Sequence, residues 1–177
     1  FKNVDYKICS KETINTEENA KMIKQFNPDL VLAFGPSIIK DPVLSILPED
    51  FINMHLGLSP QYKGAATLFW PFYYLEPQFA GITFHRISKK VDAGEILHQC
   101  RPLLEHDDGI HDVSAKAVLN ALEDLKTIVY LKEKNLKFDY VPQKQTGKLF
   151  YASDFKPHHL RLIYDLFDNK IVNEYLN

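Results

Sequence analysis

Residues 16–34 constrain the fold of this chain more than any other stretch, because they predict a helix, a tight turn and a buried strand in succession. Residues 16–26 have one apolar helical face, and Thr16 can cap that helix. The face is made of Ala20, Ile23 and Phe26. Pro28 then disfavours helical geometry at the residue before it. Residues 30–34, LVLAF, are typical of a strand buried on both faces of a parallel sheet, so the unit indicates an α/β fold.

The rest of the chain alternates between strand and helix patterns. Strands are predicted at residues 51–55, 81–87, 95–103 and 148–152. Helices are predicted at residues 67–76, at 112–134 and from about residue 157, with a loop and a short helix over 36–48. Asp112 is the expected cap of the long helix. The apolar face of that helix is predicted to consist of Val118, Leu122, Leu125 and Val129.

Composition and charge exclude several classes of protein. The 177 residues suffice for one domain with a sizeable core. A net charge of -2 provides no broad basic surface for nucleic acid or an anionic membrane. The apolar runs are too short to span a bilayer, and no signal-peptide pattern opens the sequence. Cys9 and Cys100 fit no metal or redox spacing, which favours reduced thiols in a cytoplasmic protein.

Polar side chains stand at the ends of two predicted strands. Asn53 and His55 occupy alternate positions, so their side chains face one way where the second predicted strand ends. Ligands of open α/β sheets bind beyond such strand ends. Asp92 lies in the turn VDAGE, and His85 lies in a strand on the same face as Thr83. Considered singly, each of these residues is also explained as a turn cap or as a packed, hydrogen-bonded side chain.

No other local pattern indicates a catalytic or metal site. The histidines have no metal-ligand spacing, and the glycines form no phosphate-binding fingerprint. The sequence contains neither a serine nucleophile elbow nor a CxxC redox pair. The local patterns on their own therefore leave the function open.

Taken in chain order, the polar residues form one longer pattern. It comprises Asn53-x-His55, LSPQYKGA at 58–65, Trp70, GITFHRI at 81–87 and VDAGEIL at 91–97. This pattern resembles the formyltransferase family, whose members transfer a formyl group from 10-formyltetrahydrofolate to an amine. The resemblance covers roughly residues 28–100, and a weaker match follows at GKLFYASDF, residues 147–155.

The resemblance implies a Rossmann-like α/β fold with a mainly parallel sheet flanked by helices. Residues 1–142 would form the catalytic domain, and residues 143–177 would form a strand-and-helix extension of the same domain. The family begins with a strand–loop–helix–strand segment, whereas here at most one strand, around residues 4–9, precedes the first helix. We therefore expect this sequence to lack the N-terminal strand–helix segment.

The resemblance also implies roles for individual residues. Asn53, His55 and Asp92 would be catalytic, because an amide and an imidazole can donate to a developing oxyanion and a carboxylate can handle protons. The formyl donor would be bound by Phe34, Gly35, Pro36, Ser37, Ile38 and Ile39. The residues expected to contact the substrate or support the site are Tyr62, Lys63, Gly64, Thr83 and His85. Lysine at position 63 replaces the arginine that is usual in the family, and no metal is implied.

The acceptor is the least determined part of this expectation. HLGLSP at residues 55–60 resembles the amino-sugar branch of the family, so we expect a small-molecule amine, with nucleotide-linked amino sugars as candidates. Three alternatives stay open: a 10-formyltetrahydrofolate hydrolase, a methionyl-tRNA formyltransferase-like protein and a non-catalytic folate-binding module. The residues after 145 leave no room for the C-terminal domain that methionyl-tRNA formyltransferases add, which argues against a nucleic acid partner. The tail strand and helix could pair two copies of the chain into a homodimer.

Overall fold

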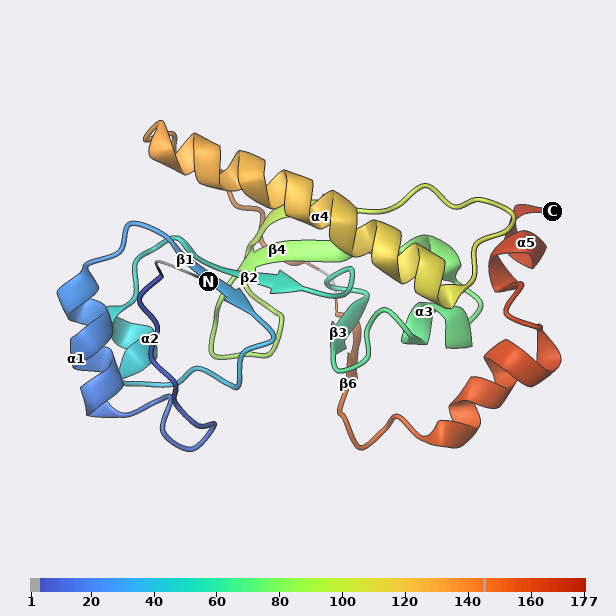
Figure 1. Ribbon diagram of the computed structural model, residues 1–177, viewed down its shortest axis with the longest axis horizontal. Coiled ribbons are helices and arrows are strands. Elements are labelled where there is room, and N and C mark those ends of the chain that lie inside the picture. Colours follow the sequence, from blue (N-terminus) through green and yellow to red (C-terminus); the bar gives the residue numbers. More distant parts are fainter. Residues whose placement is uncertain (1–3, 145) are drawn as a thin grey trace.

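A four-stranded sheet forms the centre of the molecule (Figure 1). The computed structural model describes residues 4–144 and 146–177. In spatial order the strands are β1 (Val31–Phe34), β2 (Phe51–His55), β4 (Ile82–Arg86) and β5 (Ile96–Cys100). All four lie inside predicted strands, while residues 4–9 form no strand.

The expectation of a mainly parallel sheet is wrong. β1 and β2 run parallel, but β2 pairs antiparallel with β4, and β4 pairs antiparallel with β5. Residues 87–95 join β4 to β5 without a helix, and a parallel pairing would need a much longer crossover connection. The chain therefore has a mixed α/β fold.

β1 is less buried than its apolar sequence predicts. It lies at the edge of the sheet, where Leu32 and Phe34 are 42% and 63% exposed. These two side chains share a face with Ile52 and Met54, which pack against the long helix α4 (Ile110–Glu133). Because α4 packs on β2 and β4, the apolar side of β1 is left uncovered.

The first predicted helix is confirmed. α1 (Glu17–Phe26) begins after Thr16, whose hydroxyl accepts a hydrogen bond from the Asn19 N–H. α1 and the short helix α2 (Val43–Ile46) pack beside the sheet through Ala20 and Val43. Phe26, which was expected on the packed face, is 67% exposed.

The long helix is confirmed, but its cap and its buried face differ from the prediction. Gly109 is the N-cap, and Asp112 lies three residues later, where its carboxylate accepts the Gly109 N–H at 2.9 Å. The fully buried positions are Val113, Ala117 and Ala121. Leu122, on the predicted face, is 43% exposed. Small side chains allow the helix axis to approach the sheet closely, so the alanines, not the larger residues, mark the contact.

A second sheet brings together segments that are distant in sequence. β3 (Tyr62–Gly64) pairs in parallel with β6 (Lys148–Phe150). Gly64 has a φ of +91°, and a Cβ added there would lie 2.0 Å from the Phe150 carbonyl oxygen. Glycine is therefore required where the two strands meet. An aromatic core that includes Tyr62, Trp70 and Phe150 surrounds this sheet.

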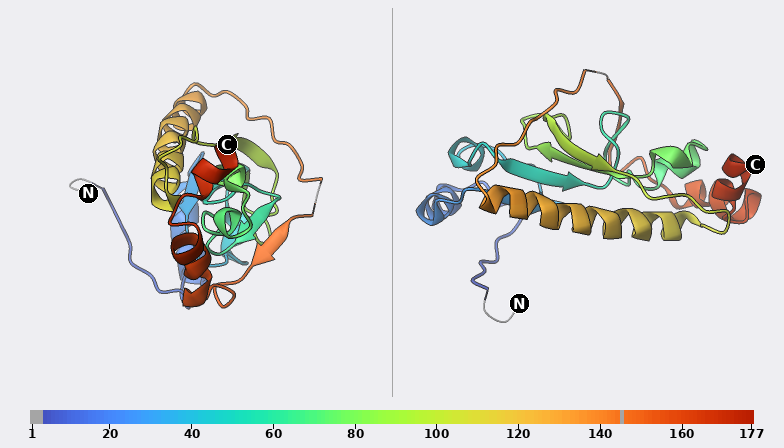
Figure 2. Two further views of the ribbon diagram at one scale, coloured as in Figure 1. Left: turned by 90° about the vertical axis from the view of Figure 1, so that its right-hand side faces the viewer. Right: turned by 90° about the horizontal axis from the view of Figure 1, so that it is seen from above.

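Two predicted helices are shorter or broken. The segment predicted as a helix over 67–76 contains only α3 (Trp70–Tyr73), followed by η1 (Pro77–Phe79). The tail is not one helix but three short ones: η2 (Pro157–His159), η3 (Leu162–Leu166) and α5 (Ile171–Leu176). Figure 2 shows this tail, in red, at the same end of the molecule as α3. In the part of the chain that the structure describes, no helix has the length and apolarity to cross a membrane.

The position of α4 on the sheet predicts opposite effects for two neighbouring residues. Ala121→Leu forces a large side chain into the contact and should lower the free energy of unfolding by about 1–3 kcal/mol. Leu122→Ala removes a side chain that is 43% exposed, and should change the free energy by less than about 1 kcal/mol. Urea denaturation measures both values. A larger loss for Leu122→Ala than for Ala121→Leu would contradict this packing.

Candidate active site

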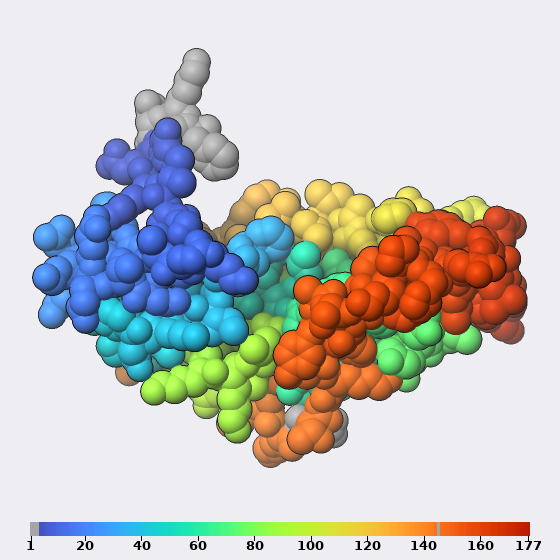
Figure 3. Space-filling model, turned by 90° about the horizontal axis from the view of Figure 1, so that it is seen from below, coloured from blue at the N-terminus to red at the C-terminus, as the bar shows by residue number. Residues whose placement is uncertain are grey.

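The carboxyl end of β2 opens into a cavity of about 710 Å³. In Figure 3 the surface is hollowed between the blue N-terminal region and the orange-to-red tail. The whole predicted donor loop lines this cavity: Phe34, Gly35, Pro36, Ser37, Ile38 and Ile39. So do Asn53, His55, Gly64, His85 and Asp92.

The alternation of β2 aims two polar side chains at the cavity. Ile52 and Met54 pack toward α4, so Asn53 and His55 point to the opposite face. Asn53 lies opposite His85 in the register of β2 and β4. This pairing places Asn53 Nδ2 3.3 Å from His85 Nε2. A cross-strand neighbour thus brings a second imidazole to the site.

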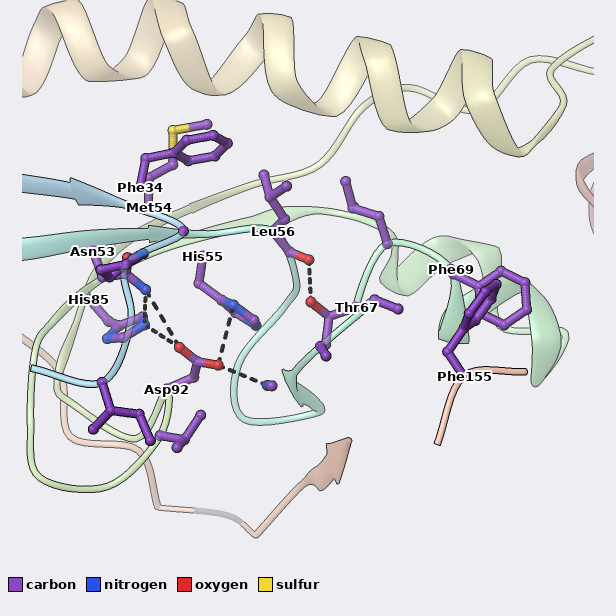
Figure 4. Close-up of a pocket in the computed structure, with 18 of the residues that line it drawn as sticks. Phe34, Asn53, Met54, His55, Leu56, Thr67, Phe69, His85, Asp92 and Phe155 are labelled. Carbon is purple, nitrogen blue, oxygen red and sulfur yellow. Dashed lines mark hydrogen bonds and ion pairs between the residues drawn. The ribbon is translucent and has the colours of Figure 1, made fainter. Parts of the chain in front are cut away.

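Asp92 is the point at which these side chains meet (Figure 4). Its Oδ1 lies 3.3 Å from His85 Nε2 and 3.5 Å from Asn53 Nδ2. Its Oδ2 lies 3.4 Å from His55 Nδ1 and accepts the Gly64 N–H at 2.8 Å. The three residues that the sequence predicted to be catalytic therefore surround one carboxylate.

The hydrogen-bond partners decide which ring nitrogen of His55 carries the proton. Nε2 lies 2.9 Å from the Tyr62 carbonyl oxygen, and because a carbonyl only accepts, Nε2 bears the hydrogen. Nδ1 of the neutral ring then turns its lone pair toward Asp92 Oδ2 at 3.4 Å. Two acceptors face each other here. One added proton would convert their contact into a charge-assisted hydrogen bond.

His85 is arranged in the same way on the other side of the carboxylate. Its Nδ1 lies 2.8 Å from the Arg86 carbonyl oxygen and must donate to it. Its Nε2 accepts from Asn53 and faces Asp92 Oδ1. Each carboxylate oxygen is therefore next to one imidazole.

Burial and charge give this cluster its protonation state. Burial lowers the pKa of His55, although the charge of Asp92 and the carbonyl of Tyr62 oppose that shift. Burial would raise the pKa of Asp92, but contacts with His85, His55 and the Gly64 N–H outweigh it and hold that pKa below its usual value of 3.8. At neutral pH a neutral imidazole thus faces an ionised carboxylate, and the pair can accept a proton.

Other predicted site residues lie farther from the cavity. Tyr62 has a buried ring and reaches the site only through its carbonyl oxygen. Thr83 accepts the Ser59 N–H and donates to the Gly57 carbonyl, so it holds the loop after β2. Neither these two side chains nor Lys63 line the cavity. The two isoleucines of the donor loop differ: Ile39 packs in the core, and Ile38 is 60% exposed.

Several features of the site were not singled out in the sequence. A Cβ at Gly57 would lie 2.6 Å from His55 Nε2, so this glycine leaves room for the imidazole. The far side of the cavity is formed by Phe69, Ile110, His111, Ser114, Phe155, Leu160 and Tyr164. Figure 4 shows Phe69 and Phe155 across the cavity from Phe34. These residues come from three separate segments, and no local spacing links them.

The described ranges 4–144 and 146–177 contain no group of three His, Cys, Asp or Glu side chains that could hold a metal ion. The chemistry considered below therefore uses only the side chains and backbone groups around Asp92.

Comparison with known proteins assigns the chain to a family. The family described as "Formyl transferase" matches residues 2–129 of the 177 residues. The chain belongs to the formyl transferase family. The methionyl-tRNA formyltransferase of Thermodesulfovibrio yellowstonii is 30% identical over 169 residues, which are 94% of this chain and 53% of the relative. The chain thus spans about half the length of this curated formyl transferase.

Solved structures of formyl transferases share the fold. The formyltransferase PseJ from Anoxybacillus kamchatkensis, in complex with UDP-4,6-dideoxy-4-formamido-L-AltNAc and tetrahydrofolate, is 26% identical with a TM-score of 0.65. That match covers 83% of this chain and 76% of PseJ. A 4-N formyltransferase from Francisella tularensis has a TM-score of 0.66 at 20% identity and covers 80% of this chain and 57% of its own.

The lowered pKa of His55 predicts a loss of stability in mild acid. The unfolded chain takes up a proton on this ring near its usual pKa of 6.5, whereas the folded chain does not. Protons therefore favour the unfolded state, and the free energy of unfolding should decrease as the pH falls below 6.5. Urea denaturation across this pH range measures the decrease.

His55→Gln supplies the control, because it removes the titrating group and should make the pH dependence shallower. His98→Gln replaces a histidine outside the cavity whose side chain is 44% exposed. The two variants should differ in slope. An unchanged slope in His55→Gln would contradict a buried, neutral His55.

Proposed function

We propose that this chain transfers a formyl group from 10-formyltetrahydrofolate to a primary amine of a small-molecule acceptor. The observation that carries this proposal is the Asp92 carboxylate, which lies 3.4 Å from His55 Nδ1 at the edge of the cavity. Amine formylation requires a site that takes a proton from the attacking nitrogen. An ionised carboxylate beside a neutral imidazole provides one.

The reaction needs one proton to leave and one to arrive. The acceptor nitrogen forms a bond to the formyl carbon, and the bond from that carbon to the folate nitrogen breaks. His55 and Asp92 receive the proton that the acceptor nitrogen loses and return one to the departing folate nitrogen. The chain's own contribution is thus a proton held between Nδ1 and Oδ2, a position in which it is hydrogen-bonded at both ends.

Asn53 is suited to the oxygen on which negative charge develops. Its Nδ2 makes only long contacts, at 3.3 Å to His85 and 3.5 Å to Asp92, and these can be exchanged for a stronger bond to an oxyanion. No group in the described residues donates to Asn53 Oδ1, which is buried. A buried acceptor of this kind favours an incoming N–H. Asn53 could therefore contact both the formyl oxygen and an amine.

The cavity lining supports a place for the formyl donor. The apolar loop at residues 34–39 and the segment at residues 88–91 border the cavity beside Asp92. Exposed Ile38 and Phe34 offer flat apolar contact to a pterin ring, whereas Ile39 serves the core. The opposite side, with Phe69 and Phe155, is then left for the acceptor.

A nucleotide-linked amino sugar is the acceptor that we propose first. The match to PseJ supports it, since that protein was solved with a UDP-linked formamido sugar. Methionyl-tRNA is the second candidate, because the methionyl-tRNA formyltransferase of Thermodesulfovibrio yellowstonii is 30% identical. Hydrolysis of the formyl donor without any acceptor is the remaining outcome.

Replacing the proton-handling pair should abolish most of the turnover. Asp92→Asn and His55→Ala should each lower kcat by about 10²- to 10⁴-fold, as expected for loss of general acid–base catalysis. His98→Ala, outside the cavity, should keep the wild-type rate. The assay follows tetrahydrofolate release, and circular dichroism checks folding. Near-wild-type rates in both site variants would refute the roles proposed here.

The acceptor is identified by the same assay with three additions. A UDP-linked 4-amino sugar, methionyl-tRNA or buffer alone is mixed with 10-formyltetrahydrofolate and the protein. We expect tetrahydrofolate release to depend on the amino sugar. Release that depends on the tRNA, or that occurs in buffer alone, would contradict the proposed acceptor.

A further inference from the structure

A segment far from the catalytic pattern runs along the free edge of the sheet and ends at the Asp92 loop. Val141 forms a bridge with Ile96, with a 2.8 Å backbone hydrogen bond in each direction. Tyr140 donates to Asp50 at 2.8 Å and stacks under the Arg86 guanidinium. These contacts fix the backbone immediately before Gln143.

Gln143 uses its amide nitrogen to hold the loop that carries Asp92. Nε2 lies 3.0 Å from the Asp92 carbonyl oxygen and 2.7 Å from the Gly94 carbonyl oxygen. Both hydrogens of the NH2 group are therefore directed at carbonyls of one short turn. The other end of the amide, Oε1, is buried and receives no hydrogen bond from the described residues. The side chain thus serves the turn with its donor end alone.

The turn needs such support because its backbone is strained. Asp92 has a φ of 45°, in the left-handed region that residues with a side chain rarely adopt. Gly94 is pressed against β4, where an added Cβ would lie 1.8 Å from the Arg86 carbonyl oxygen. Apart from Gln143, only the weaker Ser59 hydroxyl contact, at 3.3 Å, reaches the Asp92 carbonyl within the described residues. Strained residues persist where the surroundings over-determine their conformation.

We propose that Gln143 is a positioning residue, which holds Asp92 in its left-handed conformation so that the carboxylate stays against His55. This inference rests on the proposed function for its catalytic meaning. Its structural content, a coupling between residue 143 and the His55–Asp92 contact, stands apart from any activity. The ordinary alternative is that Gln143 only stabilises the loop, without effect on the carboxylate.

A double-mutant cycle read by NMR separates these alternatives. The Nδ1 nitrogen of His55 is observed in ¹⁵N-histidine-labelled protein at one pH for wild type, Gln143→Met, Asp92→Asn and the double variant. Met keeps the length of the side chain and removes the donor. We expect each single variant to shift this resonance in the same direction. The double variant should shift it no further than Asp92→Asn alone.

Control variants distinguish positioning from loss of stability. Tyr140→Phe breaks the bond to Asp50 in the same segment and should lower stability without moving the His55 resonance. If Gln143→Met does not fold, Gln143→Glu replaces it, because a protonated Glu retains one donor and should give a smaller shift. An unshifted resonance in a folded Gln143 variant, or equal shifts in Tyr140→Phe, would overturn the proposal.

Kinetics then link the coupling to the reaction. With 10-formyltetrahydrofolate and a UDP-linked 4-amino sugar, Gln143→Met should lower kcat by about 10- to 100-fold, as small misplacements of catalytic groups do. The KM for the formyl donor should stay close to the wild-type value. An unchanged kcat would contradict the positioning role. If wild type shows no turnover, the proposed function fails, while the NMR cycle still decides the role of Gln143.

Discussion

The position of the Asp92 carboxylate is the constraint on which the rest of the site depends. One oxygen accepts the Gly64 N–H at 2.8 Å, and each oxygen faces an imidazole nitrogen at 3.3–3.4 Å. Burial alone would favour the protonated carboxyl. These contacts reverse that preference, since the pKa of Asp92 lies below its usual value. An ionised carboxylate beside the neutral ring of His55 gives the cavity its capacity to accept a proton.

The fold brings this carboxylate into place from several separate segments. β2 and β4 supply Asn53 and His85 as cross-strand partners. The second sheet contributes the Gly64 N–H to Asp92 and the Tyr62 carbonyl to His55, so it sets both the carboxylate and the ring tautomer. The two sheets are therefore coupled at the site. This explains why a small two-stranded sheet, closed by the distant strand β6, matters to a formyl transferase whose polar residues lie mainly on the larger one.

Local patterns predicted the elements well and their surroundings poorly. The alternation in β2 placed Asn53 and His55 on one face, and the cap at Thr16 was correct. Burial of β1 and the packed face of α4 were wrong, because both depend on which strands the helix covers. The mainly parallel sheet was also wrong. Asp92 could be linked to His55 only through resemblance to the family, and the contacts of Gln143 had no local signal, since they join residues 49 and 51 positions apart.

The charge state of Asp92 provides the most direct test of this account. A pH titration of its side-chain carboxyl carbon by ¹³C NMR reports that state in the folded protein. We predict a pKa below the usual 3.8, and an increase in that pKa when His55 is replaced by Gln. A pKa above 3.8 in the wild-type protein would mean that burial prevails over the flanking imidazoles, and the carboxyl could not act as the proton acceptor.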